Sequence, residues 1–184
     1  MFRSLIGVAP VLFGIAFVSA STGLVATTVG VRLGLEAVPP HLVSFVLTGF
    51  PFGFLLGCLF GRQVIGAVGP VRAFAAFGGI ATACALGLAL VDDAYVWTLF
   101  RAGTGFCAAG LYTVTESWLN ARATVATRGA VLAAYMITDK LSYASGQSLV
   151  ASADPMAPTL FMVAGLLLSL CLVPVALARE WNHG

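Results

Sequence analysis

The stretch "RAGTGFCAAGLYTVTESWLNARATVATRG", residues 101–129, starts with an arginine, continues through small and apolar residues, and reaches a Glu-Ser-Trp-Leu-Asn cluster near its end. Small residues allow two helices to approach closely. A guanidinium within an apolar helix is costly in a bilayer unless it meets water or a carboxylate. The meaning of Arg101 therefore depends on the solvent that surrounds this segment.

The composition indicates that the solvent is a lipid bilayer. Of the 184 residues, 60% are hydrophobic and only 9% are charged, and the mean hydropathy is +1.01. Soluble domains carry about 25% charged residues, so this chain cannot cover its surface in water. The net charge of +2 is too small to indicate a nucleic-acid partner, and we expect none. The cysteines lie singly in apolar runs, so we expect no disulfide, metal site or cofactor. They are Cys58, Cys84, Cys107 and Cys171.

The sequence predicts an all-α membrane protein with six transmembrane helices. A spanning helix needs roughly 20 apolar residues. The stretches that satisfy this are 5–30, 42–64, 72–91, 94–119, 128–150 and 158–178. The first stretch has an alternative interpretation as a signal peptide cleaved after Ala20, although its apolar character continues to Val29.

The basic residues predict the orientation of these helices. Cytoplasmic loops are enriched in Lys and Arg. With the amino terminus inside, one basic residue, Arg32, faces outward, together with the acidic Asp92, Asp93 and Asp154. Those that face the cytoplasm are Arg3, Arg62, Arg72, Arg122, Arg128 and Arg179. We expect both termini to be cytoplasmic.

A weak internal repeat relates the two halves of the chain. A shift of 87 residues pairs Gly23-Leu24 with Gly110-Leu111 and Cys84 with Cys171. The second and fifth stretches match after two further residues, which pairs Gly57 with Gly146. A unit of three spans must insert upside down relative to its copy. We therefore expect a single bundle with an inverted 3+3 repeat, about 1–91 and 92–184.

The polar residues concentrate on the fourth and fifth stretches. Steps of three or four residues put Arg101, Tyr112 and Glu116 on one broad face of the fourth helix. On the fifth, Asp139 lies near the bilayer midplane and Lys140 beside it. The predicted transport pathway comprises Arg101, Tyr112, Asp139, Lys140, Tyr143 and Gln147. Residues 73–90 of the third stretch and 159–178 of the sixth carry no charge, and these two helices are expected to face lipid.

Alternative interpretations exist for these residues. Arg101 lies about 10 Å from the outer helix end at 1.5 Å per residue, so it could reach outward to Asp92 or Asp93. Asp139 and Lys140 could form static ion pairs between helices. We expect Arg101 and Asp139 to pair with each other in at least one state. The hydroxyls of the first helix are expected mostly to bond to carbonyls of their own helix.

Three segments together resemble the major facilitator superfamily of transporters. "GCLFGRQVIGAVGPVR", residues 57–72, resembles its cytoplasmic signature loop, and "RAGTGFCAAG", residues 101–110, its helix-4 motif. "ESWLNARATVATRG", residues 116–129, resembles the loop after helix 4, most closely in a bacterial branch with a Glu-Ser-Trp-Leu-Asn signature. The first loop departs from the family pattern, because Gly61 stands where the family has an aspartate.

The resemblance implies a fold and a function. Family members have twelve helices, so six helices correspond to one half, here the amino-terminal one. The resemblance implies a secondary active transporter that moves a small solute by alternating access, with Asp139 as a candidate proton-coupling site. The predicted cytoplasmic gate comprises Gly57, Gly61, Arg62, Glu116 and Arg128. The second half would come from homodimerisation or a separate chain.

The expected location is the bacterial inner membrane, with the lipid bilayer as a partner. An enzyme is not expected, because the sequence offers no metal cluster, phosphate loop, or nucleophile beside a base. The alternative is a non-transporting membrane subunit or assembly factor that retains the half-transporter fold.

Overall fold

The computed structural model describes residues 2–177, and the side chains of residues 7–176 among them. All regular structure in this part of the chain is helical. The helices are α1 (Phe2–Leu35), α2 (Pro40–Val68), α3 (Pro70–Leu90), α4 (Ala94–Arg122), α5 (Arg128–Ser148), the short 3₁₀ helix η1 (Leu149–Ser152), α6 (Thr159–Leu170) and α7 (Leu172–Leu177). A helix thus covers each predicted stretch, the last one in two pieces. The side chain of Arg3 and all of Arg179, both predicted to be cytoplasmic, lie outside the described residues.

Local chemistry explains where the helices end. Gly69 has a φ of 86°, a conformation that glycine adopts without strain, and it separates α2 from α3. The side chain of Asp93 caps α4 by accepting from the main-chain N–H groups of Tyr95 and Val96. Pro174 has no N–H to donate to the carbonyl four residues earlier, which accounts for the break between α6 and α7.

Four of the described helical segments are long and apolar enough to cross a membrane. They are Gly7–Leu35, Pro40–Val68, Pro70–Leu90 and Thr159–Ala176. The helices α4 and α5 have 29 and 21 residues, but each carries charged side chains within its length. These two helices are not among the four candidate spans, so the prediction that α4 and α5 also cross the membrane stays a prediction.

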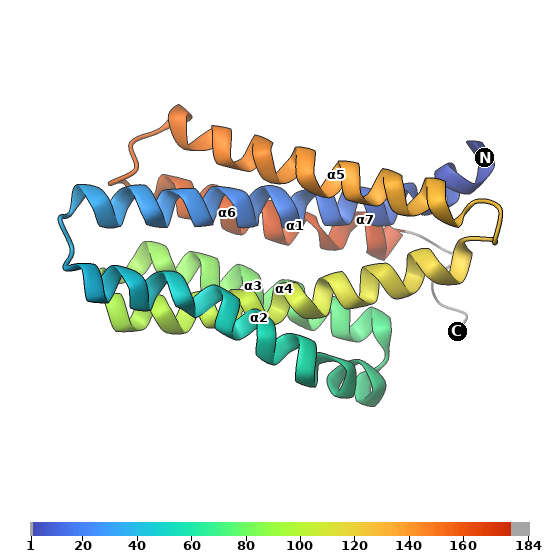
Figure 1. Cartoon of the computed structure of the whole chain (residues 1–184), viewed down its shortest axis with the longest axis horizontal. Coiled ribbons are helices and arrows are strands. Elements are labelled where there is room, and N and C mark those ends of the chain that lie inside the picture. Colours follow the sequence, from blue (N-terminus) through green and yellow to red (C-terminus); the bar gives the residue numbers. More distant parts are fainter. Residues whose placement is uncertain (1, 178–184) are drawn as a thin grey trace.

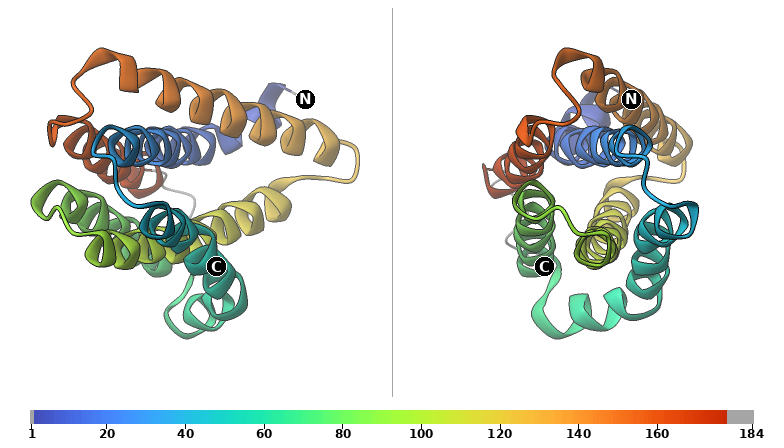
Figure 2. Two further views of the ribbon diagram at one scale, coloured as in Figure 1. Left: turned by 60° about the vertical axis from the view of Figure 1, so that its left-hand side comes forward. Right: turned by 90° about the vertical axis from the view of Figure 1, so that its left-hand side faces the viewer.

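The helices run roughly along the long axis of the molecule in two layers (Figure 1). One layer contains α1, α5, α6 and α7, and the other contains α2, α3 and α4. Seen end-on, α3 and α6 lie on one side of the bundle, α2 and α5 lie on the other, and α1 and α4 lie between them (Figure 2, right). The most extensive packing joins α2 to α4 and α1 to α5.

Glycines allow these two pairs of helices to touch backbone to backbone. A Cβ on Gly53 of α2 would collide with the main chain of Ala102 in α4. A Cβ on Gly146 of α5 would collide with the main chain of Ala20 in α1. Such close approach maximises dispersion contacts, which hold helices together where the surrounding lipid is as apolar as the side chains.

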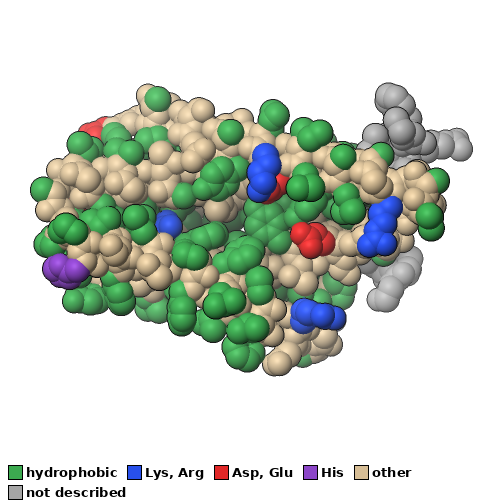
Figure 3. Space-filling view, viewed as in Figure 1, with side chains coloured by type: hydrophobic (Ala, Val, Ile, Leu, Met, Phe, Trp, Pro, Cys, Tyr) green, Lys and Arg blue, Asp and Glu red, His purple; other side chains and the backbone are tan. Residues whose placement is uncertain are grey.

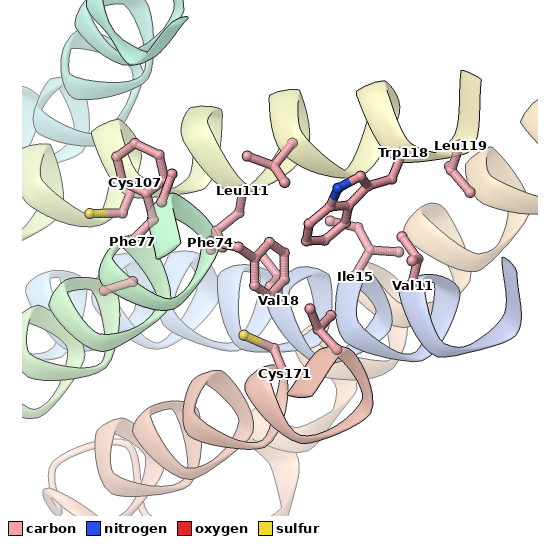
Figure 4. Close-up of a cluster of buried hydrophobic side chains, with 14 of the residues drawn as sticks. Val11, Ile15, Val18, Phe74, Phe77, Cys107, Leu111, Trp118, Leu119 and Cys171 are labelled. Atoms are coloured by element: carbon pink, nitrogen blue, oxygen red, sulfur yellow. The ribbon is translucent and has the colours of Figure 1, made fainter. Parts of the chain in front are cut away.

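A buried apolar cluster occupies the interior where α1, α3, α4 and α6 meet (Figure 4). The rings of Phe74 and Trp118 pack there with centroids 5.4 Å apart and planes inclined by 37°. The outer faces of α3 and α6 expose large apolar residues, among them Ile80 and Leu166. Apolar faces of this kind suit contact with lipid tails, and lipid exposure of α3 and α6 stays a prediction. The two helices also contribute inward, because Ala81 and Leu168 line a central cavity.

Candidate functional site: a polar groove between the layers

The carboxylate of Asp139 is the centre of a polar cluster in the middle of α5. Its Oδ1 accepts hydrogen bonds from Ser19 Oγ at 2.5 Å and from the Tyr112 hydroxyl at 2.9 Å. Its Oδ2 lies 2.8 Å from the Lys140 Nζ. Asp139 is buried, whereas the Lys140 side chain is 78% exposed. The cluster therefore joins α1, α4 and α5 through one buried carboxylate.

The pairing of Asp139 with Lys140 differs from the static bridges between helices considered from the sequence. Neighbouring residues on a helix point about 100° apart. The lysine side chain is long and flexible enough to reach back to the carboxylate beside it. The ion pair consequently lies within α5 and leaves Lys140 at the open side of the groove.

Arg101 lies deeper between the layers and is only 5% exposed. Its Nε donates to the main-chain carbonyl of Val46 at 3.2 Å, and its guanidinium carbon lies 5.8 Å from the centre of the Phe50 ring. Among the described residues it forms no ion pair. The proposed outward reach to Asp92 or Asp93 is wrong in this structure, because Asp92 binds another arginine and Asp93 caps α4.

Two adjoining hollows contain these side chains. A cavity of about 190 Å³ is lined by Arg101 and residues of α1, α2, α3, α4, α5 and α6. A more open groove of about 350 Å³ is lined by Asp139, Lys140, Tyr112 and Glu116. Both hollows are lined by Thr22, Phe50 and Tyr143, so they are contiguous. In Figure 3 the face between the layers is hollowed, and acidic and basic side chains lie beside the hollow.

The predicted gate residues are not joined by ion pairs in this structure. Glu116 is exposed, and its Oε1 accepts from the Tyr135 hydroxyl at 3.1 Å. Arg62 and Arg128 are exposed, and neither forms an ion pair with a described residue. Gly57 packs closely on Phe106 and Ala109 of α4, and Gly61 lies near Gly110. A gate contact between Glu116 and either arginine stays a prediction for another conformation.

The structure brings most of the predicted pathway residues together, with one exception. Arg101, Tyr112, Asp139, Lys140 and Tyr143 all line the contiguous hollows. The exception is Gln147, which is exposed and lines neither hollow. Its neighbour Gly146 packs against α1, and this turns position 147 away from the groove.

Sequence reasoning missed the role of Ser19. Thr22 and Thr28 donate to carbonyls one turn earlier in α1, as expected for hydroxyls in this helix. Ser19 instead donates to Asp139, and Ser21 donates to the Ala164 carbonyl in α6. The sequence does not show which hydroxyl of this apolar helix has a partner on another helix. The packing of α5 on α1 brings Ser19 to Asp139.

A second charged cluster lies at the end of the bundle where α1 meets the α3–α4 connection. Arg32 is 6% exposed, and it binds Glu36 at 2.8 Å and Asp92 at 2.6 Å. Its guanidinium carbon lies 5.2 Å from the centre of the Trp97 ring. Arg32 therefore belongs to the last turn of α1 rather than to a loop, and it ties α1 to the start of α4.

The chain is similar to bacterial transporters of the major facilitator superfamily (MFS). It is 28% identical over 174 residues to an MFS-type transporter of Enterobacter sp. (strain 638), a match that covers 94% of this chain and 45% of the relative. It is 29% identical over 139 residues to an MFS-type transporter of Yersinia enterocolitica, which covers 76% of this chain and 36% of the relative. This similarity and the apolar helices together indicate a multi-pass membrane protein.

No family model matches the chain, and no solved structure matches it. The chain spans less than half the length of both relatives.

Proposed function

We propose that the chain forms one six-helix half of a secondary active transporter, the amino-terminal half, and that the groove between its layers is part of the solute pathway. The observation that carries the proposal is the buried carboxylate of Asp139, held by Ser19 and Tyr112 in the middle of a predominantly apolar bundle. An ionisable side chain at membrane depth is costly and usually marks a solute or proton pathway. Transport would proceed by rocking of this half against a second one.

Two helix crossings support an inverted repeat of residues 1–91 and 92–184. In one crossing Gly146 of α5 lies against Ala20 of α1, and in the other Gly57 of α2 lies against Phe106 of α4. The shift of 87 residues moves Ala20 to position 107, next to Phe106. Because Gly57 and Gly146 are also paired by the repeat, the two crossings are counterparts.

The open side of the groove supports a partner in the form of a second six-helix half. Lys140 and Glu116 are exposed there, and polar groups facing lipid would be costly. A second half would cover this face and complete the pathway. It would come from further residues of a longer polypeptide, from a second copy of this chain, or from a separate chain. The setting would be the bacterial inner membrane, with both termini cytoplasmic.

The test is solute-dependent proton flux in liposomes. The protein, alone and joined to a second six-helix half, is reconstituted with a pH-sensitive dye inside, and a panel of organic acids, amines and neutral solutes is added outside. We expect flux that Asp139→Asn abolishes, because the amide cannot exchange a proton. Asp154→Asn is the matched control, since Asp154 lies in an exposed turn where an amide oxygen can still accept from the Met156 N–H.

The outcomes separate the two functions considered. Flux in the wild type and in Asp154→Asn, with none in Asp139→Asn, supports a proton-coupled transporter. If Asp139→Asn still shows flux, the transport function is supported but Asp139 is not the proton-coupling site. Absence of flux with every solute, with and without a second half, would contradict transport and favour the non-transporting subunit.

A further inference from the structure

We propose that the cavity beside Arg101 binds the carboxylate of a small organic anion. The proposal rests on the transport function, because it names the class of solute that the pathway accepts. The sequence alone leaves an acid, a base, a zwitterion or a cation open. The arrangement of hydrogen-bond donors in the cavity favours the acid.

The guanidinium of Arg101 has donors without acceptors. An arginine carries five N–H donors and no acceptor. Its Nε–H is used by the Val46 carbonyl, and no described residue accepts from the Nη groups. Among the described residues, the one side-chain polar atom that is fully buried and has no hydrogen-bond partner is Thr115 Oγ1. The unpaired Nη atoms of Arg101 are therefore not fully buried. The free side of the fork is therefore open to the cavity that Arg101 lines.

The other polar side chains that line the cavity are uncharged, so the Arg101 guanidinium makes the cavity positive. The hydroxyl hydrogens of Ser21, Thr22 and Thr104 are committed to main-chain carbonyls, at 2.9, 2.8 and 2.9 Å respectively. Tyr143 forms no hydrogen bond with a described residue, so its hydroxyl remains a free donor. No carboxylate is among the residues that line this cavity. A bound anion would meet one guanidinium fork and one phenol, and the wall of the cavity itself contributes no carboxylate.

The nearby carboxylates are already occupied. Asp139 lines the adjoining groove, where Ser19, Tyr112 and Lys140 bind its oxygens. Glu116 is exposed and accepts from Tyr135. Neither carboxylate contacts Arg101 in this structure, so the guanidinium is available to a carboxylate brought by a solute. Arginine binds such a group with two parallel hydrogen bonds.

The rest of the cavity fits a small apolar body. Its walls include Val18, Val25, Phe50, Leu111 and Leu168. Its volume of about 190 Å³ is below the roughly 300–1,000 Å³ typical of sites for drug-sized ligands. The solute class is therefore a monocarboxylate with a compact aliphatic or aromatic body.

The test compares three probes of one shape with different charge. Benzoate, benzamide and benzylamine, which is protonated at neutral pH, are titrated into the whole chain in nanodiscs, and binding is followed by calorimetry in a low-salt buffer. Charge-assisted hydrogen bonds correspond to roughly tenfold to hundredfold in affinity. We expect benzoate to bind at least tenfold more tightly than either of the other probes.

Variants assign the binding to the cavity. Arg101→Gln should weaken benzoate by tenfold or more, and Arg101→Lys should restore only part of the affinity because the fork is lost. Tyr143→Phe should weaken it several-fold, and this variant keeps the cavity wall intact if Arg101→Gln fails to fold. Arg72→Gln is the control, because Arg72 is exposed and lies away from the cavity. It should bind benzoate as the wild type does.

Four outcomes would overturn the proposal. If benzamide or benzylamine binds as tightly as benzoate, the site does not select an anion. If the Arg101 and Tyr143 variants all bind benzoate with unchanged affinity, the cavity is not the binding site. If chloride at equal concentration displaces benzoate, the site binds inorganic anions and the organic-acid assignment fails. Flux with an amine but no benzoate binding would refute this inference and leave transport standing. Benzoate binding without any flux would contradict transport and leave the binding of an organic anion in this cavity standing.

Discussion

Replacing Gly53 by alanine should destabilise the packing of α2 on α4. An added methyl would lie 2.6 Å from the carbonyl carbon and 2.7 Å from the Cα of Ala102, and closer still to its carbonyl oxygen. Carbon atoms pack favourably at about 3.5–4.0 Å, so the two helices would have to separate by about 1 Å at this crossing. Both sides of the contact are main chain, which cannot rotate away as a side chain would.

The magnitude follows from two opposing effects. Overpacking in a tight interior costs about 1–3 kcal/mol. Alanine recovers up to about 1 kcal/mol because it favours the helix more than glycine does. The net loss in the free energy of unfolding should be about 1–2 kcal/mol, to be measured as a shift of the unfolding midpoint in mixed micelles with increasing SDS, followed by circular dichroism.

A second glycine of the same helix provides the matched control. Gly66 has no atom within 4 Å of the position that a Cβ would take. Gly66→Ala should therefore leave the free energy of unfolding unchanged or raise it by up to about 1 kcal/mol. Equal stability of the two variants would refute the reasoning, because it would mean that α2 and α4 do not touch at Gly53.

Three further predictions follow from the same contacts. Arg32→Gln should lower the free energy of unfolding by about 1 kcal/mol, since Asp92 is 68% exposed and stays hydrated without its partner; a loss no larger than that of Arg72→Gln would show that the cluster contributes nothing. In a chain with Cys58→Ser, single cysteines at Ala126 and Ala153 should react with an impermeant maleimide from opposite sides of the membrane, and labelling from one side would reject the proposed topology. Arg101→Ala and Asp139→Ala should have additive effects on unfolding, because the two side chains have separate partners here; coupled effects on solute flux alone would show that they pair in another conformation.

The sequence was sufficient for the helices and for most side chains of the groove. Proline, glycine and aspartate mark the breaks chemically, as Gly69 and Asp93 illustrate. The spacing of three and four residues predicted a shared face for Arg101 and Tyr112, because a helix face depends only on the chain's own geometry, and both side chains line the hollows between the layers. These features are local, so a single sequence contains them.

The partners of these side chains could not be predicted, because they depend on how helices pack. Nothing in the order of residues links Ser19 to Asp139, which lie 120 positions apart. Arg101 could not be assigned to the Val46 carbonyl, since a main-chain acceptor has no residue signature. Gln147 was predicted to line the pathway with Lys140 but is turned outward, because its neighbour Gly146 packs closely on α1.

The positions of the buried polar contacts along the chain have a consequence for biosynthesis. Synthesis proceeds from the amino terminus, so earlier helices are made first. The Val46 carbonyl and the Phe50 ring precede Arg101, and Ser19 and Tyr112 precede Asp139. Arg101 and Asp139 are thus translated after these groups, whereas Arg32 near the end of α1 precedes its partners Glu36 and Asp92. The nascent chain can pass Arg101 and Asp139 directly to waiting partners, and neither side chain has to remain alone in lipid until later helices are made.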